Sequence, residues 1–164
     1  MSSKTFRGRH LPVIISIVIA LMLSMMPLPE GIRNFRPDWV ALIMIHWAMA
    51  VPRSYGVGVA WVVGLVLDVS QGTLLGQHAL ALTVITFITI KSNLLMRMFP
   101  LLQLTATVFA LNAVYRFLLF WINGVAGVEA PSSVYWGPVL TGALVWPMMY
   151  ILLSGIRYRV ESRH

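Results

Sequence analysis

Four long stretches of the sequence contain no Asp, Glu, Lys or Arg. A helix needs about 17 to 25 predominantly apolar residues to cross a bilayer core. Charged residues make up 10% of the sequence, whereas they make up about a quarter of an ordinary water-soluble domain. A transmembrane β-barrel would require alternating polar and apolar residues, which these stretches lack. The stretches, residues 11–28, 69–90, 98–115 and 130–156, therefore predict an all-α, polytopic membrane protein.

Prolines and polar residues divide the chain into six expected spans within a single integral membrane domain, residues 1–164. The second and third spans are short, because about 15 residues make a helix of ~22 Å and the hydrocarbon core is ~30 Å thick. They must thin the bilayer, extend into their loops or form a re-entrant pair. We expect a six-helix bundle with spans at about 11–28, 37–51, 55–69, 77–97, 101–122 and 135–156.

The basic residues are distributed unevenly between the two sides of this predicted bundle. Loops on the cytoplasmic side of a membrane protein carry an excess of Lys and Arg. If the N-terminus is cytoplasmic, nine basic residues lie inside, two (Arg33 and Arg36) lie outside, and Arg116 falls within the fifth span. The sequence therefore predicts a multi-pass membrane protein with both termini in the cytoplasm. The nine are Lys4, Arg7, Arg9, Arg53, Lys91, Arg97, Arg157, Arg159 and Arg163.

The usual residues of catalysis and metal binding do not form recognisable sets. Cysteine is absent, and the four histidines show no H-x-x-x-H spacing. Of the five acidic residues, only Asp68 is expected at membrane depth. No phosphate-binding loop or dinucleotide motif occurs. The basic residues flank apolar runs and form no patch for nucleic acid. We therefore expect no enzyme activity, no cofactor, no metal and no nucleic-acid partner, but contact with membrane lipid.

Small residues recur at every fourth position in and after the third expected span. Such spacing places them on one ridge of a helix, where a second helix can approach closely. Two interpretations stay open: a tight crossing within the chain, or a face that contacts another molecule. The candidate ridge consists of Gly56, Ala60, Gly64, Gly72 and Gly76, with Asp68 in the same series.

Asp68 and Arg116 are the two charges expected within the membrane. At 1.5 Å per residue, Asp68 lies ~20 Å and Arg116 ~24 Å from the inner ends of their helices, so their depths in the membrane nearly match. An isolated charge near mid-bilayer costs roughly 2.5 to 3.5 kcal/mol, which favours pairing or a polar cavity. Asn112, one turn from Arg116, is a third candidate. The alternative is that Arg116 extends to the outer headgroups while Asp68 lies at the outer boundary.

Three segments together resemble the bacterial rod shape-determining protein MreD family. One resembles the F-R-P-x-W entry to that family's second helix, another its G-x-x-x-D-x-x-x-G-x-x-L-G element, and the third its proline-interrupted last helix. The length and helix order also agree. The segments are Phe35-Arg-Pro-Asp-Trp39, Gly64-Leu-Val-Leu-Asp68-Val-Ser-Gln-Gly72-Thr-Leu-Leu-Gly76, and Leu144-Val-Trp-Pro147.

The resemblance implies a non-enzymatic scaffold of the elongasome, the bacterial inner-membrane assembly that makes lateral peptidoglycan in rod-shaped cells. It implies MreC, MreB, RodZ, RodA and a class B penicillin-binding protein as partners, and a fold similar to the substrate-binding subunits of energy-coupling-factor transporters. Binding of the MreC membrane helix is the expected mechanism. Asp68 and Arg116 are candidates for setting its geometry, together with an outer corner made by Arg36, Pro37 and Trp39.

The competing interpretation is a small-molecule binding subunit of a membrane transporter. A cavity with convergent polar groups around Asp68, Asn112 and Arg116 would favour it. A tightly packed, dry Asp68 would favour the scaffold.

Overall fold

Every regular element in the described part of the chain is helical. The computed structural model describes residues 3–129 and 131–161. The tail residue Arg163 lies outside them, and at Lys4, Arg7, Arg9, Arg157 and Arg159 only the helical backbone is described. Each of the six expected segments contains one long helix. These are α1 (Ser3–Met25), α3 (Trp39–Ala50), α4 (Val57–Gln71), α5 (Gln77–Met98), α6 (Leu101–Val125) and α7 (Gly137–Glu161), with a short α2 (Glu30–Arg33) and a 3₁₀ turn, η1 (Ser133–Trp136).

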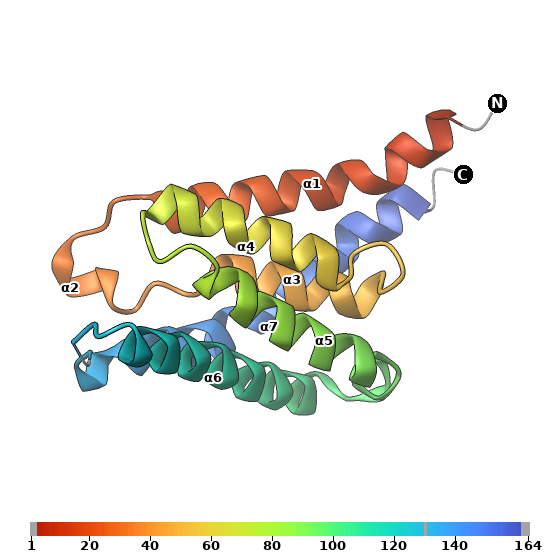
Figure 1. Cartoon of the computed structure of the whole chain (residues 1–164). Helices are drawn as coiled ribbons and strands as arrows, with labels where there is room; N and C mark the ends of the chain where they lie inside the picture. The colour runs from red at the N-terminus through yellow and green to blue at the C-terminus, as the bar shows by residue number, and fades with distance from the viewer. Residues whose placement is uncertain (1–2, 130, 162–164) are drawn as a thin grey trace.

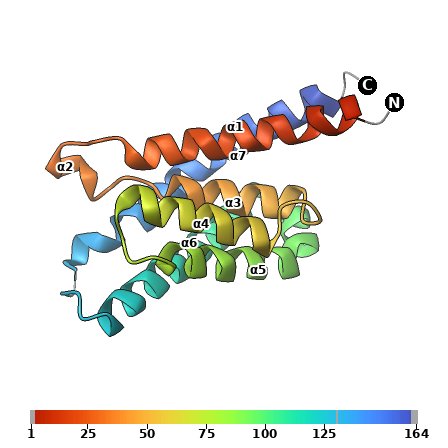
Figure 2. The ribbon, with the colours of Figure 1, turned by 45° about the horizontal axis from the view of Figure 1, so that its top comes forward.

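Successive long helices run toward opposite ends of the molecule (Figure 1). The start of α1 and the end of α7 consequently lie at one end in both views (Figures 1 and 2). The short α2 lies at the other end, together with the turn between α4 and α5. We call this second end the loop end.

Among the residues that the structure describes, three helical segments are long and apolar enough to cross a membrane: Gln77–Met98, Leu101–Val125 and Ser133–Ile156. The apolar parts of the other long helices are shorter, at His10–Met25, Trp39–Ala50 and Val57–Gln71. Helix α7 continues through Pro147, the position at which the family motif places its interruption.

Helix α3 lies at the centre of the packing. It spans 12 residues, all of them buried except Trp39. It contacts α1, α5, α6 and α7, and Trp47 donates a hydrogen bond of 2.8 Å from Nε1 to Ser16 Oγ of α1. A helix that is apolar on every side and covered by neighbours belongs to a core. Its short length therefore does not have to match the bilayer thickness.

An arginine of another helix satisfies the carboxyl end of α3. The last carbonyls of a helix have no partner within it. Arg97, at the end of α5, donates from Nη2 to Met49 O at 2.9 Å and to Ala50 O at 2.8 Å. This basic residue, expected only to signal topology, also joins α3 to α5.

The small residues of α4 pack inside the chain, against α5. A Cβ at Gly64 would lie 2.3 Å from Ala79 Cα and 2.5 Å from Ala79 N, so only glycine permits this approach. Ala60 is fully buried, and a Cβ at Gly56 would lie 3.8 Å from Ile90 Cδ1. In this part of the ridge, the small residues serve a crossing within the chain.

Gly72 and Gly76 do not belong to this ridge, contrary to the sequence-based expectation. Their φ angles are 65° and 98°, and no atom lies within 4 Å of a Cβ placed on either. Only glycine adopts such angles readily. Gly72 ends α4 and Gly76 precedes α5, so both shape the turn between the two helices.

Candidate functional site

Asp68 lies in the last turn of α4 and binds the beginning of α5. Its Oδ2 accepts from Gly76 N at 2.9 Å, and its Oδ1 accepts from His78 N at 3.1 Å. The first amides of a helix lack internal partners and carry partial positive charge, so a carboxylate suits this place. Thr73 Oγ1 donates to Asp68 Oδ1 at 3.1 Å. Asp68 is thus fully enclosed and stabilises the turn that Gly72 and Gly76 make possible.

His78 completes the surroundings of this carboxylate. Its Nδ1 lies 2.7 Å from Asp68 Oδ1. Because the carboxylate can only accept, Nδ1 is the donor and carries the proton. Sequence reasoning missed this contact, since the residues lie in different helices and ten positions apart. This enclosed, fully bonded Asp68 favours the scaffold interpretation.

Arg116 pairs with Asp38 and not with Asp68. Its Nε donates to Asp38 Oδ2 at 2.7 Å, and its Nη2 donates to Asp38 Oδ1 at 2.6 Å. The expected pair with Asp68 is therefore wrong, because the backbone amides of α5 and His78 already occupy that carboxylate. Asp38 directly precedes α3, and among the acidic residues only Asp68 was expected at membrane depth.

The ion pair is partly buried and supported by an aromatic ring. The Arg116 and Asp38 side chains are 17% and 15% exposed. Arg116 Cζ lies 5.0 Å from the centre of the Tyr135 ring, and Tyr135 donates its hydroxyl to Arg116 O at 3.2 Å. Bidentate geometry fixes an arginine more strongly than a single contact does. Asp38, Arg116 and Tyr135 thus tie together the start of α3, the later part of α6 and η1.

Asn112 is also separate from Asp68. It is fully buried, and neither of its amide atoms has a hydrogen-bond partner among the described residues. It packs against α7 at Gly142, where a Cβ would lie 2.5 Å from Asn112 Nδ2. The expected group of Asp68, Arg116 and Asn112 is therefore divided among three different environments.

The outer corner is tied to the end of α1. Arg36 donates from Nη2 to Met26 O at 2.8 Å, and from Nη1 to Ser24 O. These contacts satisfy carbonyls at the carboxyl end of α1. Pro37 and Trp39 are partly buried, and Trp39 packs against the core. The corner is thus a fixed part of the fold at the loop end.

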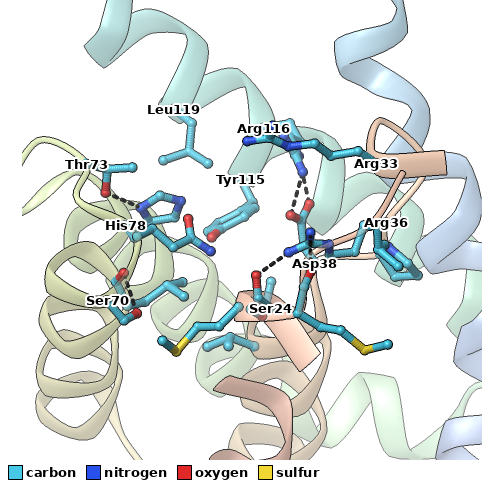
Figure 3. Close-up of a pocket in the computed structure, with 18 of the residues that line it drawn as sticks. Ser24, Arg33, Arg36, Asp38, Ser70, Thr73, His78, Tyr115, Arg116 and Leu119 are labelled. Atoms are coloured by element: carbon cyan, nitrogen blue, oxygen red, sulfur yellow. Dashed lines mark hydrogen bonds and ion pairs between the residues drawn. The ribbon is translucent and has the colours of Figure 1, made fainter. Parts of the chain in front are cut away.

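A cavity of about 590 Å³ opens among these groups. Figure 3 shows Arg33, Arg36 and Arg116 around Asp38 on one side, and Thr73 with His78 on the other. No set of His, Asp and Glu able to hold a metal occurs in the described ranges. The cavity is lined by Ser24, Met25, Met26, Pro27, Leu28, Arg33, Arg36, Pro37, Asp38, Val40, Ala41, Leu67, Ser70, Gln71, Thr73, His78, Tyr115, Arg116 and Leu119.

Comparisons with known proteins give a consistent result. The family model described as "rod shape-determining protein MreD" matches residues 4–156. A relative in Haemophilus influenzae, the rod shape-determining protein MreD, is 29% identical over 147 residues. The match covers 88% of this chain and 89% of that protein. No solved structure matched the chain.

Proposed function

Because this chain belongs to the MreD family of rod shape-determining proteins, we propose that it is a non-enzymatic scaffold subunit of the elongasome. Membership itself implies a membrane protein with a role in rod shape determination. The finer proposal is that the chain binds MreC and helps to organise the enzymes of lateral wall synthesis. MreB, RodZ, RodA and a class B penicillin-binding protein are the further proposed members of the assembly.

The observation that carries this proposal is the extent of the family match, which covers residues 4–156. A match over nearly the whole chain includes the loop end as well as the helices. The packed Asp68 adds support, because a fully bonded carboxylate in the α4–α5 turn stabilises a rigid frame. Such a frame suits a protein that positions a partner.

We propose that the helices form a six-span bundle in the inner membrane with both termini in the cytoplasm. The alternating helix directions and the adjacent ends of α1 and α7 support an even number of crossings (Figure 2). Nine basic residues on the terminal side against two on the loop side support this orientation. The loop end would then face outward, beside the periplasmic domain of MreC.

The proposed contact for MreC includes the outer corner of Arg36, Pro37 and Trp39. The Arg36 contacts to α1 and the Asp38–Arg116 pair hold this corner rigid. Ile32 and Phe35, beside the corner in sequence, are 59% and 50% exposed. An apolar surface next to a fixed corner suits a membrane helix together with the segment that follows it.

A second candidate is a small-molecule binding subunit, and the cavity favours it. Ligand cavities commonly have volumes of about 300 to 1,000 Å³, and this one has about 590 Å³ with converging polar groups. The proposed similarity to substrate-binding subunits of energy-coupling-factor transporters is in keeping with such a role. The cavity is, however, centred on the Asp38–Arg116 pair, while Asp68 and Asn112 do not line it.

Copurification distinguishes these candidates. The tagged chain is extracted in mild detergent, and the proteins recovered with it are identified. We expect MreC to be recovered with the chain, and W39A to lower the MreC recovered several-fold. W61A is the matched control, because Trp61 lies in α4 and is 42% exposed. Thermal unfolding of both variants verifies that they fold. Recovery of a transporter ATPase pair without MreC would contradict the scaffold proposal.

A further inference from the structure

Three basic residues stand outside the positive-inside pattern, and all three line one cavity. Arg33 and Arg36 are the two basic residues on the loop side of the predicted topology, and Arg116 is the one within a span. The structure brings them together at the loop end (Figure 3). Their position therefore needs an explanation other than topology.

The charges of this cavity do not balance within the chain. Asp38 is the only acidic residue among those that line it, and its two carboxylate oxygens already accept from Arg116. The Arg33 side chain forms no hydrogen bond or ion pair with the described residues, and only its backbone is bonded. Arg36 binds only neutral carbonyls, and its buried Nε has no partner among the described residues. Two positive charges thus remain uncompensated beside one neutralised pair.

The rest of the lining shows what kind of molecule fits. The end of α1 and the segment after it contribute the apolar residues Met25, Met26, Pro27 and Leu28, and α6 contributes Leu119. Thr73 and His78 provide polar groups on the opposite side. A molecule that suits this surface has a compact anionic group with several acceptor oxygens, joined to an apolar part. Arginine binds such an oxygen group at more than one atom.

We propose that this cavity binds the phosphate of an anionic lipid headgroup. Arg33 and Arg36 contact the phosphate, and the Asp38–Arg116 pair forms the wall of the cavity beside them. The acyl chains leave past the apolar residues at the end of α1 into the surrounding bilayer. The proposal does not depend on MreC binding. Free phosphate compounds share this recognition chemistry, and the test includes them.

Native mass spectrometry of the full-length chain in detergent tests the site. One arm titrates phosphatidylglycerol and, separately, uncharged phosphatidylcholine. The other arm titrates inorganic pyrophosphate. R33Q is the central variant, because the Arg33 side chain is exposed and bonds to no described residue, so its replacement should leave the fold intact. R53Q is the matched control, since Arg53 is an exposed arginine between α3 and α4.

We expect phosphatidylglycerol to bind more tightly than phosphatidylcholine, and R33Q to weaken that binding roughly tenfold, as the loss of a charge-assisted hydrogen bond does. R53Q should bind like the unchanged chain. The double variant R33Q/R36Q is then compared with the double variant R53Q/K91Q, because both lose two positive charges. Pyrophosphate binding that R33Q weakens, without preference between the lipids, would assign the site to a free phosphate compound. Equal binding by R33Q and R53Q in both arms would overturn the proposal.

Discussion

Arg116 and Asp38 are 78 residues apart in the sequence and form a bidentate ion pair, with N–O distances of 2.7 and 2.6 Å. The pair joins the later part of α6 to the start of α3 at the loop end. Both side chains are less than a fifth exposed. Water therefore screens the pair only partly, and its loss should affect the whole loop end.

The first prediction concerns the energetic coupling of this pair. D38N and R116Q should each destabilise the chain, and the double variant should lose about 1 to 3 kcal/mol less than the sum of the two, as residues in contact do. The free energies of unfolding are measured in detergent. R116K serves as a second variant, because lysine keeps the positive charge but cannot donate two parallel hydrogen bonds to the Asp38 carboxylate.

The matched control is a double-mutant cycle of the same kind between Asp68 and Arg116. These residues form no hydrogen bond or ion pair with each other and have separate partners, so their effects should add within about 0.5 kcal/mol. Strong coupling in this second cycle and none in the first would show that the ion pair is assigned to the wrong carboxylate.

The second prediction concerns Asp68. D68A should cost about 3 to 5 kcal/mol of stability, because it leaves His78 and the first amides of α5 without their acceptor. D68N keeps one acceptor oxygen and should cost less. The measurement is the midpoint of thermal unfolding together with the amount of protein in the membrane. E129A is the control, since Glu129 is an exposed acid, and a similar loss in E129A would contradict this role for Asp68.

The third prediction concerns the crossing of α4 and α5. G64A should destabilise the chain by about 1 to 3 kcal/mol or more, because the added Cβ meets the backbone of Ala79. G58A is the matched control in the same helix, where a Cβ meets nothing within 4 Å. It should be neutral or slightly stabilising, since alanine favours a helix by about 1 kcal/mol over glycine. Equal stability of the two variants in denaturant would rule out the close approach.

The sequence predicted the helical segments well, because uncharged runs and prolines mark them directly. A long helix overlaps each expected segment, and α4 approaches the backbone of α5 closely at Gly64, one of the small residues in the four-residue spacing. Gly72 and Gly76 continued the spacing but not the helix. The spacing of small residues in a sequence does not show where the backbone φ angle becomes positive and the helix ends.

The pairing of charges could not be predicted, because depth along a helix does not show toward which neighbouring helix a side chain points. Asp68 and Arg116 matched in depth, yet the Asp68 carboxylate turns toward the amides of α5. Asp38 was not expected at membrane depth, and His78 had no acidic neighbour in sequence. The cavity joins segments from residues 24–41, 67–78 and 115–119, so only the tertiary structure reveals it.

A role of this chain in rod shape determination requires that depletion of the chain changes the shape of the cell. The ratio of cell length to width is measured by microscopy in the bacterium that encodes the chain, as the chain falls below detection. We expect the rods to widen and become round, and renewed expression of the unchanged chain to restore the rod shape. Cells that stay rod-shaped without the chain would contradict this role.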